Sequence, residues 1–233
     1  MKTIINEIKK ELNSLITIPE DKRSRFFKSG KGDYSEHDIF IGVKVPDLRR
    51  LAKKYSALDL SDSEKLIQSP INEERQLALY ILTNQFKKGD TKIQEKIYEF
   101  YLKNLKFINN WNLVDVSAHL ILGAYLLNRD KSTLFDLANS ENLWKRRISI
   151  VATWYFIRNQ ELDTTIEIAK ILLNDNHDLI HKAVGWMLRE MGKKDEDKLV
   201  IFLEKYAEIM PRTKLRYSIE KFSGETRKKW LLK

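Results

Sequence analysis

Apolar residues recur every three or four positions along nearly the whole chain, which is the period of an amphipathic α-helix. Near the N-terminus, one such face carries Ile4, Ile5, Ile8, Leu12 and Leu15. The strict alternation that marks a half-buried β-strand is almost absent. The pattern therefore predicts an all-α fold.

Prolines and short polar residues mark where these helices begin, because they tolerate or satisfy the N–H groups of a first turn. The predicted starts are at Pro19, Pro46, Ser61/Asp62, Pro70, Asp90, Ser132, Asp163, Asn176 and Pro211. The helix that begins at Pro19 is expected to end at Gly30. The stretch 30–38 is the one long loop signal, with two glycines and several polar residues.

Five segments resemble one another, each passing from a polar or charged residue into an apolar helix. Their reference positions are Gln76, Asp115, Arg147, Lys182 and Leu215. The intervals between them are 39, 32, 35 and 33 residues, the length of a helical hairpin. This spacing predicts one domain over 1–233, with a helical N-terminal part at 1–57 and HEAT-like repeats over about 58–233.

Stacked hairpins of this kind form an α-solenoid, whose concave surface is usually the binding surface. An irregular helical bundle with accidental self-similarity is the alternative. The composition supports helices in either case, since only 8 Gly and 4 Pro disfavour a turn-dense β-sandwich or barrel.

The absence of cysteine excludes disulfides, thiolate metal sites and cysteine nucleophiles. The 4 His do not have the spacing of a metal site, so no metal and no cofactor are expected. Lysine and arginine exceed aspartate and glutamate by 42 − 33 = 9, which suggests a polyanionic partner such as nucleic acid. The concave groove of the solenoid is therefore expected to be basic.

The N-terminal segment is charged, so it does not have the apolar core of a signal peptide. No uncharged apolar run approaches the roughly 18 residues that a membrane span requires. These patterns predict a cytoplasmic protein with no membrane partner.

In the helix predicted over 110–127, polar and aromatic side chains share one side. The apolar stripe is expected at Leu113, Val116, Leu120, Ala124 and Leu127. Trp111, Asp115 and His119 follow one another at intervals of four on the other side. Asp115 is then either at the edge of a cleft, an acid that complements the helix dipole, or the partner of a neighbouring basic residue.

Two later helices place cations beside aromatic residues. In the helix over 180–191, Lys182, Trp186 and Arg189 lie opposite the apolar stripe. An aromatic ring between cations suits contact with phosphates and sugars, although tryptophan at helical spacing is more often part of a core. Arg147 belongs to a run of three cations at 145–147, and such a run is usually solvated. Because Arg147 directly precedes the apolar face of its helix, it is nevertheless expected to be partly enclosed.

If the repeats stack, Asp115, Arg147 and Trp186 line one groove. The chain shows no nucleophile–base pair, no phosphate-binding glycine loop and no second acid near Asp115. At these residues the sequence resembles the AlkD-like DNA alkylation repair family of HEAT-repeat DNA glycosylases. The resemblance rests on N-N-W-N-L-V-D at 109–115, W-K-R-R-I-S-I at 144–150 and H-K-A-V-G-W-M-L-R-E at 181–190, with weaker matches at 25–28 and 40–50.

The resemblance implies a catalytic role for Asp115 and DNA contacts for Trp111, Arg147 and Trp186. Lys182 matches a phosphate contact by position only, and Phe26 lies near a DNA-contacting position that can be tyrosine. The implied reaction is hydrolysis of the N-glycosidic bond of positively charged N3- or N7-alkylated purines in duplex DNA, without base flipping. The implied enzyme is a monomer.

The sequence departs from the family pattern at three positions. Phe26 lacks a tyrosine hydroxyl, Asn110 stands where other members can have tryptophan, and Asn112 stands where aspartate can occur. Two alternatives therefore stay open. One is a catalytically inactive paralogue that binds DNA, and the other is a scaffold that binds an acidic peptide.

Overall fold

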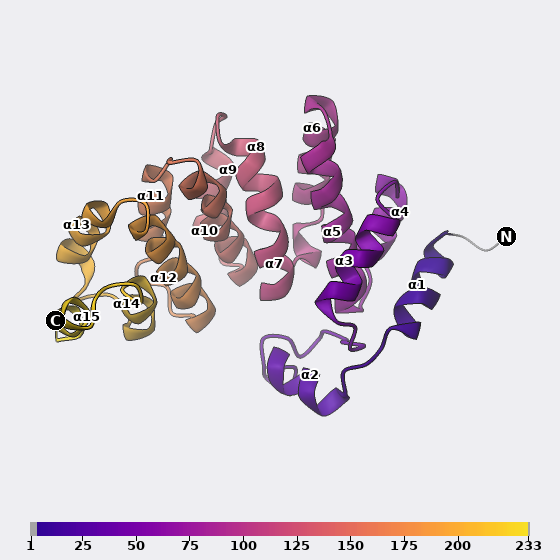
Figure 1. Cartoon of the computed structure of the whole chain (residues 1–233), viewed down its shortest axis with the longest axis horizontal. Coiled ribbons are helices and arrows are strands. Elements are labelled where there is room, and N and C mark those ends of the chain that lie inside the picture. Colours follow the sequence, from indigo (N-terminus) through magenta and orange to yellow (C-terminus); the bar gives the residue numbers. More distant parts are fainter. Residues whose placement is uncertain (1–3, 233) are drawn as a thin grey trace. The chain divides into compact units, whose positions relative to one another are not determined.

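The computed structural model describes residues 4–232, which are mostly helical (Figure 1). The chain divides into two compact units, Met1–Ser117 and Ala118–Lys233. Residues 4–232 contain no β-strand, and only two isolated bridges join Ile16 to Val43 and Ile39 to Ile71. The prediction of an all-α fold is confirmed.

Unit 1 contains the N-terminal helices and most of α7. Its elements are α1 (Ile4–Ser14), α2 (Glu20–Phe27), α3 (Val45–Lys54), α4 (Leu60–Ile67), α5 (Asn72–Lys88), α6 (Thr91–Lys103), the 3₁₀ turn η1 (Leu105–Phe107) and α7 (Trp111–Ala118). The long helix α5 is central, because α3, α4 and α6 all pack against it.

Unit 2 begins within the same helical segment. Its elements are the π-helical segment η2 (His119–Gly123), α8 (Ala124–Leu126), α9 (Ser132–Ala138), α10 (Leu143–Arg158), α11 (Asp163–Ile171), α12 (Asp178–Gly192), α13 (Glu196–Tyr206), α14 (Arg212–Ser218) and α15 (Gly224–Leu231). α10 packs against η2, α9, α11 and α12, and α12 packs against α11, α13 and α14.

In each unit, helices therefore pack against their neighbours in the sequence. This arrangement is consistent with an α-solenoid, as the spacing of the repeats predicts. The assignment of the repeats to the HEAT class, the basic concave groove and the single domain over 1–233 stay predictions.

Several helix starts agree with their sequence signals. Asp90 caps α6 by accepting a hydrogen bond from the Ile93 N–H at 2.9 Å, Pro46 lies in the first turn of α3, and Pro211 directly precedes α14. The loop predicted over 30–38 is present. The helix after Pro19 ends at Phe27 rather than Gly30, because Lys28 takes a left-handed backbone conformation with φ of 50°.

Other starts fall one or two residues from the prediction, in two cases because a neighbouring residue provides the cap. Asp59 caps α4 by accepting from the Asp62 N–H at 2.7 Å, so this helix begins at Leu60 rather than at Ser61 or Asp62. His177 caps α12 in place of Asn176 by accepting from the Leu179 N–H at 3.1 Å. α5 begins at Asn72, two residues after Pro70.

The apolar stripe predicted for the helix over 110–127 is only partly correct. Leu113 is buried, whereas the four later members are half-buried. The fully buried residues are instead Val114, Ala118, Ile121 and Leu122. Part of the reason is η2, since a π turn contains an extra residue and rotates the positions that follow it.

The stripe predicted for α12 is correct. Its core residues Ile180, Ala183, Val184, Met187 and Met191 are all buried. Within residues 4–232, no helix is both long enough and apolar enough to cross a membrane.

Candidate functional site

Trp111 and Asp115 lie one turn apart on α7, on the same side of the helix. Both side chains are half-buried. Near the end of the same helix, the hydroxyl of the fully buried Tyr101 makes a 2.9 Å hydrogen bond with Ser117 Oγ. Burial raises the pKa of Tyr101, and the negative charge of Asp115 raises it further. The negative charge of Asp115 therefore acts on a buried side chain of unit 1.

A cluster of aromatic rings attaches α2 to this part of unit 1. Phe27 stacks on Phe40 with ring centroids 4.0 Å apart and on Trp111 at 5.6 Å. Phe26 meets the Trp111 ring edge-on at 5.5 Å, and 65% of Phe26 is exposed. Because α2 buries none of its residues, these rings hold it in place. The structure thus brings together Phe26 and Trp111, two residues predicted to contact DNA.

Asn110 connects the start of α7 to the loop that ends at Asp38. Its Nδ2 donates to Asp38 Oδ2 at 2.6 Å and to Ser35 Oγ at 2.8 Å, and all three residues are buried. Arg75 of α5 forms an ion pair with the same carboxylate. A tryptophan could not make these hydrogen bonds through a side-chain amide, so Asn110 has a structural role of its own.

Asn112 connects the start of α7 to α5. Its Nδ2 donates to Asn72 Oδ1 at 2.7 Å and to Gln76 Oε1 at 3.1 Å. Asn72 in turn donates to Asp38 Oδ2 at 3.0 Å, which joins both asparagines to one buried network. We call Asp38, Asn72, Arg75, Asn110 and Asn112 the polar network. Trp111 lies between Asn110 and Asn112 in the sequence, so the network fixes the start of the helix that carries Asp115.

Asp38, Asn72 and Arg75 are not among the residues that the sequence pattern singles out. The one available signal was a run of polar residues, N-E-E-R-Q at 72–76, directly before an apolar helix. All five of these residues are buried. Among residues 4–232, no three histidine, aspartate or glutamate side chains gather as metal ligands.

In unit 2, Arg147 lies on α10 and is only 5% exposed, as expected from its place at the head of an apolar face. Its Nη1 donates to the carbonyl oxygen of Leu179, in the first turn of α12, at 2.6 Å. The guanidinium therefore lies against the start of α12, the helix that also carries Lys182 and Trp186.

Trp186 belongs to a row of three rings, which the sequence pattern predicts only in part. Its ring centroid lies 5.0 Å from that of Trp154 on α10, and Trp154 lies 4.5 Å from His119 on η2. We call these residues the ring row. A Cβ on Gly123 would lie 2.2 Å from the Ala152 carbonyl oxygen, so the close approach of η2 to α10 requires glycine.

The cations beside Trp186 are held by acids of unit 2. Lys182 Nζ lies 2.7 Å from Asp178 Oδ2 on the same helix, and its side chain is 40% exposed. Arg189 forms ion pairs with Glu190 and with Glu220, which follows α14. A phosphate at Lys182 would therefore share or replace the contact with Asp178, whereas Arg189 is bound by two carboxylates.

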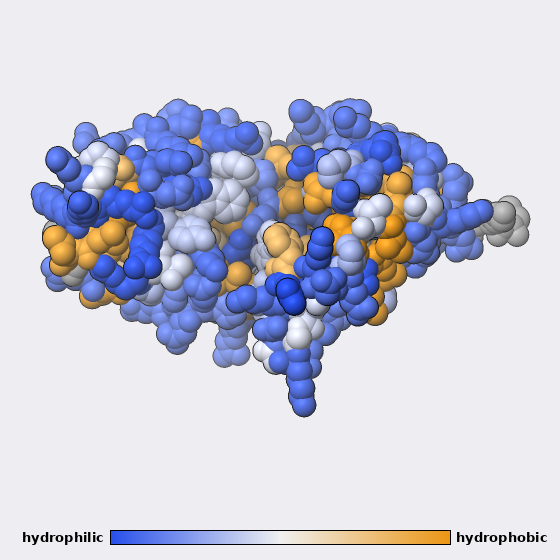
Figure 2. All heavy atoms as spheres, turned by 60° about the horizontal axis from the view of Figure 1, so that its bottom comes forward, coloured by the Kyte–Doolittle hydropathy of each residue, from blue (hydrophilic) through white to orange (hydrophobic). Residues whose placement is uncertain are grey.

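Hydrophilic side chains cover most of the face shown in Figure 2, and apolar areas interrupt them in each unit. The candidate residues form two sets. Unit 1 carries Phe26, Trp111 and Asp115, and unit 2 carries Arg147, Lys182 and Trp186.

Comparison with known proteins adds two findings. A family model described as DNA alkylation repair enzyme matches residues 8–222. A solved structure of a predicted DNA alkylation repair enzyme from Enterococcus faecalis is similar over 90% of this chain and 98% of that one, with a TM-score of 0.67 and 15% identity. None of the curated proteins matched. At this identity the solved structure supports the fold, and the family model supports the family.

Proposed function

This chain belongs to the family of DNA alkylation repair enzymes, and from this we propose that it is a DNA glycosylase. Its substrates are duplex DNA in which a purine is alkylated at N3 or N7. The reaction is hydrolysis of the N-glycosidic bond, and the protein acts as a monomer without a cofactor.

The substrate itself explains why a single acid suffices. An N3- or N7-alkylated purine carries a positive charge, so it leaves readily when the bond to the sugar breaks. Both electrons of that bond go to the base nitrogen and neutralise the purine. Protonation of the leaving group, for which most sugar-bond hydrolases use a second carboxylic acid, is not required.

Asp115 stabilises the positive charge that develops on the deoxyribose as the bond stretches. The oxygen of a water molecule then bonds to the sugar carbon that carried the base, and the water releases a proton. Asp115 also orients this water. The position of Asp115 supports this role. Asp115 is half-buried on α7, one turn after Trp111, and the polar network fixes the N-terminal end of this helix. This arrangement is the observation that carries the proposal.

The remaining site residues bind the DNA. Trp111 and Trp186 pack against sugars and backbone, exclude water and attract the developing cation through their ring faces. Arg147 and Lys182 bind phosphates, and Phe26 contacts the strand through its exposed ring. The damaged base remains stacked in the duplex, since contact is made through the backbone.

The proposal predicts that Asp115→Asn slows release of 7-methylguanine from methylated duplex DNA by about 100- to 1,000-fold. The affinity for DNA should stay close to that of the wild type or rise slightly, because the substitution keeps the size of the side chain and removes a negative charge that repels phosphates. Release of the free base under single-turnover conditions measures the first quantity, and fluorescence anisotropy with labelled duplex measures the second.

Asp136→Asn is the matched control, since Asp136 is an exposed acid on α9. Release at the wild-type rate by the Asp115 variant would remove Asp115 from the mechanism. If the wild-type protein binds methylated duplex but releases no base, the chain is a non-catalytic member of its family.

A further inference from the structure

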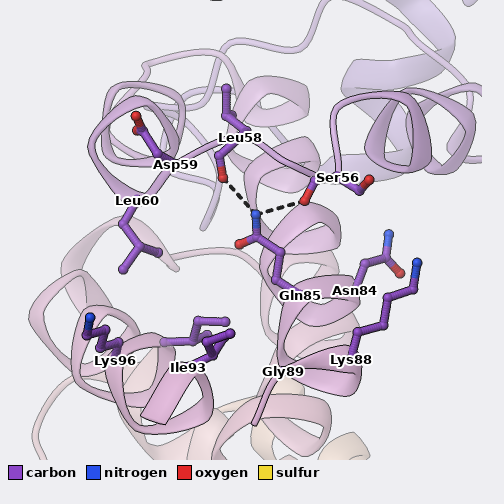
Figure 3. Close-up of a pocket in the computed structure, with 11 residues that line it drawn as sticks. Ser56, Leu58, Asp59, Leu60, Asn84, Gln85, Lys88, Gly89, Ile93 and Lys96 are labelled. Carbon is purple, nitrogen blue, oxygen red and sulfur yellow. Dashed lines mark hydrogen bonds between the residues drawn. The ribbon is translucent and has the colours of Figure 1, made fainter.

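Unit 1 contains a pocket at the C-terminal end of α5 that none of the candidate site residues lines (Figure 3). Its volume is about 440 Å³, and it opens to solvent. The walls come from the C-terminal end of α5, the first half of α6 and the segment 56–60 before and at the start of α4. Leu58, Leu60, Ile93 and Ile97 make its surface mainly apolar.

Gln85 ties two of these walls together. Its Nε2 donates to the carbonyl oxygens of Ser56 at 2.9 Å and Leu58 at 2.7 Å, as the dashed lines in Figure 3 show. Because the amide hydrogens of Gln85 are used within the wall, the pocket is shaped before any ligand arrives. Ile93 lies at the rim, and 45% of its surface is exposed. Covering this apolar surface with a ligand would be favourable in free energy.

The charge at the rim is positive. Lys88 at the end of α5 and Lys96 on α6 both line the pocket and are exposed. Within residues 4–232 neither lysine forms an ion pair. The one acid in the lining, Asp59, already accepts hydrogen bonds from Asp62 N–H at 2.7 Å and Ser61 Oγ at 2.9 Å. A ligand with an apolar group and negative charges complements this surface.

The pocket is remote from the polar network along α5. Gln76 bonds to Asn112 in the first turns of the helix, and Lys88 lies twelve residues later, about 18 Å away at 1.5 Å per residue. A molecule in the pocket would therefore leave Trp111 accessible to DNA.

We propose that this pocket binds an acidic peptide segment of a partner protein. One apolar side chain enters between Leu60 and Ile93, and the peptide's carboxylates lie against Lys88 and Lys96. DNA is a poor occupant, because the sugar–phosphate backbone cannot fill an apolar pocket. The inference concerns a surface outside the proposed reaction and does not depend on glycosylase activity.

The test uses the full chain and a fluorescein-labelled peptide of three aspartates followed by leucine and phenylalanine. Fluorescence anisotropy should show saturable binding that weakens with salt. The double variant Lys88→Glu/Lys96→Glu should lose at least tenfold in affinity. Lys10→Glu/Lys53→Glu changes the net charge equally at two exposed lysines of unit 1 and should bind as the wild type does.

Ile93→Glu provides a second variant at an exposed position, and it should also lose at least tenfold. Replacing leucine and phenylalanine of the peptide with serine should abolish saturable binding. Both variants should release alkylated bases at the wild-type rate, which separates this test from that of Asp115. The proposal is overturned if the wild-type chain does not bind the peptide, if both double variants bind it equally, or if duplex DNA displaces it competitively.

Discussion

Three consecutive charged side chains in the first turn of α5 are buried, and each is bound to a different segment of unit 1. The Glu73 carboxylate accepts hydrogen bonds from the backbone N–H groups of Ile41 at 3.0 Å and Gly42 at 2.7 Å. Glu74 lies 3.0 Å from Lys9 Nζ, and Arg75 pairs with Asp38. A charge is tolerated in such a place only when it is hydrogen-bonded or paired with an opposite charge. These residues therefore connect α5 to α1 and to the segment 38–42.

Lys214 is a buried cation of a different kind. It is fully enclosed on α14, and its Nζ donates to the carbonyl oxygens of Leu172, at 2.8 Å, and Leu173, just after α11. Burial lowers the pKa of Lys214 to about 8, although the negative charge of Asp175 opposes the shift. Lys214 satisfies carbonyl groups that the end of a helix leaves without partners.

The lowered pKa predicts that stability increases with pH above about 8. Between about 8 and the ordinary value of 10.5, the folded chain binds fewer protons at Lys214 than the unfolded chain, so the free energy of unfolding rises. The full contribution is about 3 kcal/mol. Urea unfolding from pH 7 to 10 should show this rise in the wild type and not in Lys214→Met.

The exposed Lys228→Met should behave as the wild type does, which isolates the contribution of Lys214 from that of other titrating groups. Parallel pH profiles for the wild type and Lys214→Met would mean that Lys214 keeps its ordinary pKa in the folded chain.

At the scale of elements, polar contacts at the start of α7 help to set its position, beside the apolar contacts of Trp111. Asn110 and Asn112 reach the loop at Ser35–Asp38 and the first turns of α5, and both are almost fully buried. Buried hydrogen bonds are directional, so they fix the rotation of a helix more narrowly than apolar packing does. The direction in which Trp111 and Asp115 point depends on this rotation.

The substitution Asn110→Ala should therefore destabilise the protein by about 1–3 kcal/mol, because it deprives the buried Asp38 carboxylate of a donor. Thermal and urea denaturation measure the loss. Asn109→Ala, at the neighbouring and less buried asparagine, should change the free energy of unfolding by less than about 0.5 kcal/mol. Equal losses in the two variants would show that the network does not hold the helix.

At the scale of the whole molecule, the excess of nine positive charges favours binding to a polyanion. For DNA, the number of phosphate contacts sets how steeply affinity falls with salt. The substitution Arg147→Ala should weaken DNA binding and lower the slope of log affinity against log salt by about one. Lys170→Ala, where a lysine is paired with Glu167 at 2.8 Å, is the control.

The slope is the informative measure for Arg147, because this residue also donates to Leu179 and its loss lowers stability. Anisotropy titrations at several salt concentrations measure this slope. The variants are first shown to be folded by thermal melting. A slope equal to that of the wild type would remove Arg147 from the phosphate contacts.

The sequence by itself determined the helical class, the hairpin spacing, the core stripe of α12 and the family, because apolar periodicity and short motifs are local properties of the chain. It also singled out Asp115 and Trp111 as neighbours, since residues four apart share a helix face. The observed helix starts differ from the predicted ones by up to two residues, because any of several adjacent polar residues can provide the cap.

Only the tertiary structure decided which polar residues are buried and what they bind. Asp38, Asn72 and Asn110 are far apart in the chain, and nothing in their local sequence states that they share one network. The same holds for the ring row, where His119, Trp154 and Trp186 meet because η2, α10 and α12 pack closely. Long-range hydrogen bonds and ring contacts depend on how helices rotate against one another, and periodicity along the chain does not record that rotation.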